Sequence, residues 1–264
     1  MATDPRATGV PLLIERAARH DRVVLVATIA GVTALCWSWI VPMARDMYGA
    51  MNGPSAWMMA GAWSARYLVL LWAMWAVMMA GMMLPSAAPM FLLYAAAARR
   101  SPDPDGGRLR VYAFAVGYVL VWCAFSLAAT ILQWALARLL LLTPMMEIAT
   151  PRAGGAVLLV AGLYQFTGLK HTCLRACGSP LGFLTSRWRG GAAGALRMGV
   201  GHGSMCVGCC WALMLLLFVG GVMNLWVIGA LTVFVLLEKL VPLGAYGTRA
   251  TGTLLAIGGL WMMR

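Results

Sequence analysis

Long apolar runs without a charged side chain restrict the fold of this chain more than any other feature. Several of them exceed about 18 residues, the length that indicates a membrane span. Hydrocarbon offers no water to the backbone, so each run is expected to be helical. The chain is 62% apolar and 11% charged, whereas soluble domains are about 25% charged. The sequence therefore predicts an all-α, polytopic transmembrane bundle whose surroundings are a lipid bilayer.

About seven spans are expected. Residues 1–22 are polar and mixed in charge, without the apolar core of a cleaved signal peptide, and are expected to form a cytoplasmic tail. Residues 23–264 would form one transmembrane helical domain. Pro85 and Pro89 are expected to kink the second span or to end its regular part. The expected spans are 23–41, 67–97, 111–142, 154–169, 198–219, 224–241 and 249–263.

The basic residues predict the orientation of these spans. With the N-terminus inside, fifteen of the 20 Lys and Arg residues fall in cytoplasmic segments and five fall outside, as the positive-inside rule requires. The longest connection, near residues 170–197, is then a cytoplasmic loop. The net charge of +12 is explained by this distribution in short segments, and we expect no nucleic-acid partner.

A cluster of metal-ligand side chains lies in the segment GHGSMCVGCCW. Side chains three and four positions apart share one face of a helix, so His202, Met205, Cys206, Cys209 and Cys210 are expected to lie on one face. Thiolates and imidazole are ligands for Cu(I), or for zinc at a tetrahedral site. The alternative is that the cysteines are small packing residues. Five of the seven cysteines fall between residues 173 and 210, which favours metal or redox chemistry over a disulfide framework.

Methionines form a second cluster, in MMAGMMLPSAAPM and the turn before it. Met74, Met78 and Met82 form one stripe at helical spacing, and Met79 and Met83 form another. The thioether is a soft ligand that selects Cu(I) over hard cations. Methionine is also ordinary apolar filler, so ligand and packing roles both remain open.

Two further groups carry possible ligands. His171, Cys173 and Cys177 follow the fourth expected span and form either one site with the first cluster, a second station in a relay, or incidental residues of a basic loop. Glu238 could supply an oxygen ligand or a partner for His202. It could equally form an interfacial pair with Lys239, whose side chain would extend to the lipid headgroups.

These motifs resemble a bacterial family of metal-binding integral membrane proteins, formerly a domain of unknown function. The resemblance is carried by MMAGMMLPSAAPM, by HGSMCVGCCW and by LLEK. The family includes the membrane partner of a bacterial tyrosinase, regarded as its copper chaperone, which implies the bacterial inner membrane for this chain. The positions that match the family's metal-binding motifs are Met78, Met79, Met82, Met83, His202, Cys206, Cys209, Cys210 and Glu238.

The sequence thus predicts a Cu(I)-binding membrane protein, with zinc as the other possible metal and a copper-dependent enzyme as a possible client. We expect no catalytic activity. One alternative is a copper transporter, which would need ligands at several depths of the membrane. Another is a membrane thiol-disulfide oxidoreductase, which would form a reversible disulfide. A metal-dependent membrane oxidase is less favoured, because the chain has three histidines and such sites generally need more.

Overall fold

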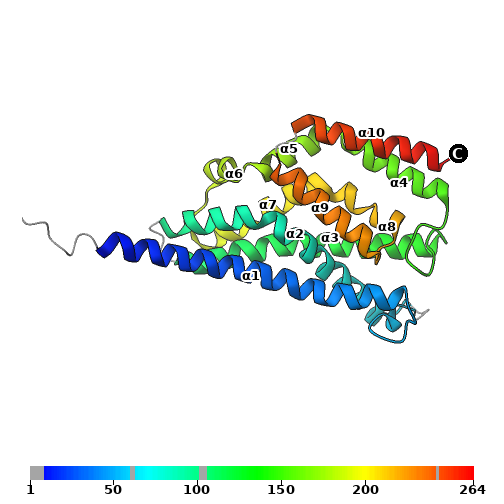
Figure 1. Cartoon of the computed structure of the whole chain (residues 1–264), viewed down its shortest axis with the longest axis horizontal. Coiled ribbons are helices and arrows are strands. Elements are labelled where there is room, and N and C mark those ends of the chain that lie inside the picture. Colours follow the sequence, from blue (N-terminus) through cyan, green and yellow to red (C-terminus); the bar gives the residue numbers. More distant parts are fainter. Residues whose placement is uncertain (1–8, 60–62, 101–105, 242–243) are drawn as a thin grey trace, which may run out of the picture.

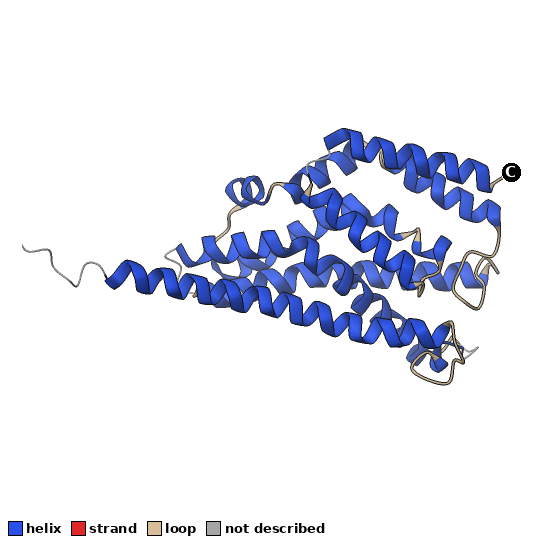
Figure 2. Ribbon diagram, in the orientation of Figure 1, coloured by secondary structure: helices blue, strands red, loops and turns tan. Residues whose placement is uncertain are grey.

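The computed structural model describes residues 9–59, 63–100, 106–241 and 244–264. These residues form helices and loops (Figure 2). The β-type pairing found among them is one isolated antiparallel bridge between Leu142 and Ile148. The all-α prediction is therefore confirmed. In chain order the elements are α1 (Gly9–Met47), the 3-10 helix η1 (Ala56–Met59), α2 (Ala65–Arg100), α3 (Gly107–Arg138), α4 (Pro151–Tyr164), α5 (Gly168–Gly178), α6 (Pro180–Arg187), α7 (Gly191–Met214), α8 (Leu217–Gly220), α9 (Leu225–Leu240) and α10 (Gly244–Met262).

Four helical segments in the described part of the chain are long and apolar enough to cross a membrane. They are Arg22–Met47 within α1, Ala65–Arg100, Gly107–Arg138, and Gly191–Gly220, which joins α7 to α8. The other three expected spans overlap α4, α9 and α10, which are shorter helices of 14, 16 and 19 residues. The fourth span was expected to run to residue 169, but α4 ends at Tyr164 and α5 begins at Gly168. The number of about seven crossings stays a prediction.

The first helix differs from expectation at its start. α1 begins at Gly9 and continues through residue 22 without a break, so residues 9–22 of the expected tail and the first expected span are one helix. Residues 1–8 of that tail lie outside the described part of the chain. Residues 12–30 contain neither proline nor glycine, and nothing in this stretch stops a helix once it has begun. In Figure 1, α1 starts at the left, and the chain ends with α10 at the right.

Both prolines lie inside α2, which continues past them. Pro85 has no N–H to give to the carbonyl of Gly81, four residues earlier. The indole N–H of Trp37 donates to that carbonyl at 3.3 Å. Gly81 also allows close packing, because a Cβ there would lie 3.0 Å from the Cβ of Cys36. Packing of α1 against α2 thus supplies the hydrogen bond that the proline removes.

Glycines let α7 lie directly on α3. A Cβ at Gly199 would overlap the carbonyl oxygen of Phe114, and one at Gly117 would overlap that of Leu196. Such contacts between small residues allow the backbones of two membrane helices to touch. The close approach carries Tyr118 of α3 up to the cysteine-bearing face of α7.

The pair formed by α4 and α10 packs in the same way along the upper edge of Figure 1. A Cβ at Gly155 would lie 2.6 Å from the carbonyl oxygen of Gly259, and one at Gly162 would lie 2.8 Å from that of Gly252. The hydroxyl of Tyr164 donates to the carbonyl of Gly208. This bond ties the end of α4 to the middle of α7, beside the cysteines.

Candidate metal-binding site

One face of α7 carries the first predicted cluster. His202, Cys206, Cys209 and Cys210 are all buried, and Met205 is half-buried at the edge of the same helix. Their spacing of three and four residues places them over consecutive turns. A continuous helix from Gly191 to Met214 therefore brings an imidazole and three thiols to one buried surface.

Hydrogen bonds hold the three thiols of α7 around a single turn. The thiols of Cys209 and Cys210 donate to the carbonyl of Cys206 at 3.1 Å and 3.0 Å. The sulfur of Cys206 lies 3.2 Å from the hydroxyl of Tyr118 and accepts from Nζ of Lys239 at 3.0 Å. Cys206 is thus the point where groups from α3, α7 and α9 meet.

The second cysteine pair joins this cluster. The thiol of Cys177, on α5, lies beside those of Cys206 and Cys209, and its interaction with these two sulfurs raises the pKa of Cys177 well above its usual range by favouring the protonated thiol. Cys173 packs against the backbone of α7, since a Cβ at Gly208 would lie 2.7 Å from its sulfur. The two cysteine groups, separate in sequence, form one cluster in space.

His202 sits in an aromatic enclosure next to the thiols. Its ring centroid lies 5.7 Å from that of Tyr118, 6.1 Å from that of Phe114 and 5.5 Å from that of Phe183. Its Nδ1 is buried and has no hydrogen-bond partner among the described residues. A buried, unpaired ring nitrogen is free to bind an incoming ligand.

The methionines of α2 lie in the core, and Met78, Met79, Met82 and Met83 are all almost fully buried. Their link to the cysteines runs through the backbone. The carbonyl of Met83 accepts from the hydroxyl of Tyr118 at 3.3 Å and from that of Ser86 at 2.9 Å. The methionine segment therefore adjoins the thiol cluster at its Met83 end.

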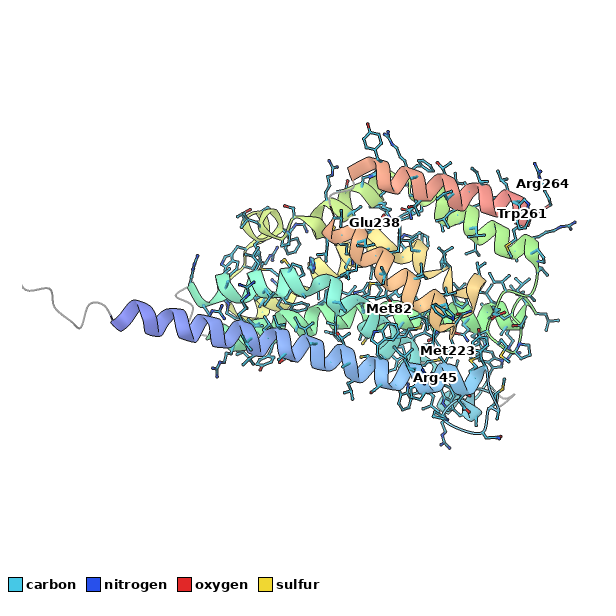
Figure 3. The ribbon with its side chains drawn as sticks, viewed as in Figure 1. Arg45, Met82, Met223, Glu238, Trp261 and Arg264 are labelled. Carbon is cyan, nitrogen blue, oxygen red and sulfur yellow. The ribbon has the colours of Figure 1, made fainter. Side chains whose placement is uncertain are left out.

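Glu238 and His171 do not lie on the face of α7 that carries the thiols. The carboxylate of Glu238 pairs with Nζ of Lys170 at 2.7 Å, and both side chains are buried. Figure 3 labels Glu238 at the end of α9 that approaches α5. Glu238 and His171 line, together with Lys239, a cavity of about 1050 Å³ among α5, α9 and α10. The structure thus places the carboxylate of Glu238 against an ammonium group.

Sequence reasoning missed three residues of the site. Tyr118 and Ser86 looked like ordinary positions in apolar helices, and Lys239 was expected at the headgroups if it paired with Glu238. The ammonium of Lys239 instead points inward to Cys206 and Ser86. The available signal was the pair of adjacent charges in LLEKLVP, because ionisable residues within membrane helices usually face the bundle interior.

The thiols are grouped but are not arranged as a chelate. Among the described residues, no set of three or more His, Cys, Asp or Glu side chains has a geometry that could hold a metal ion. The thiols of Cys209 and Cys210 point to a carbonyl, and that of Cys206 contacts Lys239. Metal loading would require these side chains to turn toward a shared centre.

A family model, PpoB2, described as a copper chaperone, matches residues 72–262, well over half of the chain. The matched range begins in α2 before the methionine segment and ends at the last residue of α10. It therefore includes the whole thiol cluster and its partners on α2, α3 and α9. No curated protein and no solved structure matches the chain. The chain belongs to the PpoB2 copper chaperone family.

Proposed function

We propose that this protein binds Cu(I) at the buried thiol cluster and delivers it to a copper-dependent enzyme, without catalysing a reaction itself. The observation that carries the proposal is the packing of α5 against α7, which sets Cys173 on Gly208 and Cys177 beside Cys206 and Cys209. Membership of a copper chaperone family supports copper as the cargo. A buried group of thiols with a free imidazole nitrogen is the donor set that soft metals take.

The proposed ligands are drawn from Cys177, Cys206, Cys209 and Cys210, with His202 completing the site. Cys206 and Cys209 are placed first because both are buried and Cys177 of α5 lies beside them. The methionines that adjoin the site at Met83 would provide weaker soft ligands along the path of the metal. Glu238 is left out of this set, since Lys170 already pairs with its carboxylate.

We further propose that the protein crosses a bacterial inner membrane about seven times with its N-terminus in the cytoplasm. The four long apolar helices support a membrane location. The start of α1 and the end of α10 lie at opposite ends of the bundle (Figure 1), which fits an odd number of crossings. Under the positive-inside rule, the basic end that contains α5 faces the cytoplasm, where thiols stay reduced.

An assay in sealed vesicles distinguishes copper delivery from copper transport. The full-length protein is placed in lipid vesicles that enclose a coloured Cu(I) chelator, and Cu(I) with a reductant is added outside. A chaperone should bind a near-stoichiometric amount of copper and release it to chelator added on the loading side. The enclosed chelator should then colour no faster than it does in vesicles without protein.

The matched control for this experiment is the C206S/C209S variant, which should bind no copper and give no release. If several copper ions per protein molecule entered the vesicles, and the variant abolished this entry, the protein would be a transporter and the delivery proposal would be wrong.

A further inference from the structure

Lys239 places a positive charge inside the thiol cluster. Its Nζ donates to the sulfur of Cys206 at 3.0 Å and to the hydroxyl of Ser86 at 3.0 Å, and the residue is 9% exposed. The adjacent carboxylate of Glu238 forms its ion pair with Lys170. Among the described residues, the nearby groups that can become anionic are the cysteine thiols, Tyr118 and Glu238.

Three helices position this ammonium. Lys239 comes from the last turn of α9, Ser86 from α2 and Cys206 from α7. The hydroxyl of Ser86 gives its own hydrogen to the carbonyl of Met83 at 2.9 Å, which leaves its oxygen free to accept from Lys239. The charge is thus held at one place next to the proposed ligands.

The donor atoms of the site do not by themselves select copper. Thiolates with an imidazole form ordinary zinc sites as well as Cu(I) sites. When two metals share the same ligand types, selectivity between them must come from other features of the site, such as its geometry, or from the availability of each metal. A protein that carries copper through a cell that also contains zinc needs an element that distinguishes the two ions.

We propose that Lys239 makes the site selective for a monovalent over a divalent metal ion, an inference that rests on the proposed function. The repulsion between the ammonium and a bound metal is proportional to the charge on the metal, so it is twice as large for Zn(II) as for Cu(I). Salt screens a buried pair of charges only weakly. The hydrogen bond from Lys239 to Cys206 is available with either metal and does not by itself change the ratio of their affinities.

The test compares the Cu(I) and Zn(II) affinities of the detergent-purified, full-length protein. Each affinity is measured without oxygen by competition with a chromogenic chelator. In K239M, which keeps the length of the side chain and removes its charge, the Cu(I)-to-Zn(II) affinity ratio should fall at least about tenfold, mainly through tighter zinc binding. K239Q provides a second neutral variant if the methionine variant does not fold.

Two further variants separate charge from packing. K239R keeps the positive charge and should stay within about threefold of the wild-type ratio. R175Q removes an exposed charge from the wall of the neighbouring cavity and should leave the ratio unchanged, because solvent screens that charge.

The outcomes distinguish this inference from the proposed function. If the wild type binds copper and the folded neutral variants have the wild-type Cu(I)-to-Zn(II) affinity ratio, Lys239 does not set selectivity. The inference is then wrong, while the proposed function stands. If the wild type binds no copper under reducing conditions, both are wrong.

Discussion

A variant with serine at both Cys206 and Cys209 is expected to lose stoichiometric copper while keeping its helical fold. Both thiols belong to the buried cluster that Cys177 joins, and a serine hydroxyl is a poor ligand for Cu(I). Loss of a group that merely supports a metal ligand often costs about 10–100-fold in affinity, so loss of two ligands should leave less than about a tenth of the wild-type copper. Metal analysis after anaerobic loading measures this directly, and circular dichroism checks the fold.

The matched control is C36S/C123S, which also removes two cysteines. These thiols lie on α1 and α3, outside the cluster, and the double variant should keep the wild-type copper content. Full copper retention in a folded C206S/C209S protein would show that the metal binds elsewhere.

Replacement of Gly199 by alanine should weaken both the fold and the site. The new Cβ would overlap the carbonyl of Phe114, and a backbone group cannot turn aside as the end of a side chain can. α7 must then move away from α3, which separates Cys206 from Tyr118. Overpacking of this kind costs about 1–3 kcal/mol, so the midpoint of thermal unfolding in detergent should fall and copper should bind less tightly.

Gly201 gives a control on the same helix. A Cβ there would meet only Phe183, at an ordinary contact distance of 3.8 Å. G201A should therefore be neutral or more stable by up to about 1 kcal/mol, since alanine favours helix over glycine. Equal unfolding midpoints for G199A and G201A would contradict the close approach of α3 and α7.

Local spacing in the sequence was enough to predict the helical class and the face of α7. A helix repeats every 3.6 residues, so the positions of His202, Cys206 and Cys209 determine their common face once the segment is helical. The start of α1 was harder to predict, because a polar composition alone does not end a helix, and residues 12–30 contain no proline or glycine to stop it.

The assembly of the site depended on contacts between distant segments, which spacing does not encode. The expected loop near residues 170–197 contains parts of α5 and α7 and all of α6. Its helix signals were local and weak, such as the cap at Thr167 and the proline at the start of α6. Whether Cys177 would meet Cys206 could not be settled from the sequence, since the answer depends on how α5 packs against α7.

The inward direction of Lys239 was the least predictable feature. A lysine near the end of a membrane helix often extends its side chain to the headgroups, and Glu238 offered a neighbouring partner. The structure separates the two charges, with Glu238 held by Lys170 and Lys239 held by Cys206 and Ser86. Only the packing of α9 against α2 and α5 decides between these arrangements.

The most direct test is to map, by alkylation and mass spectrometry, which thiols copper protects in the purified wild-type protein under reducing conditions. We predict that the protein binds near-stoichiometric copper and that the bound copper protects Cys177, Cys206 and Cys209 from alkylation. After a chelator removes the metal, the same three thiols should be alkylated. Labelling of Cys36 and Cys123 should not change with copper. If no copper bound, and the unreduced protein carried a disulfide among the clustered cysteines, the copper account would be contradicted in favour of a thiol-disulfide oxidoreductase.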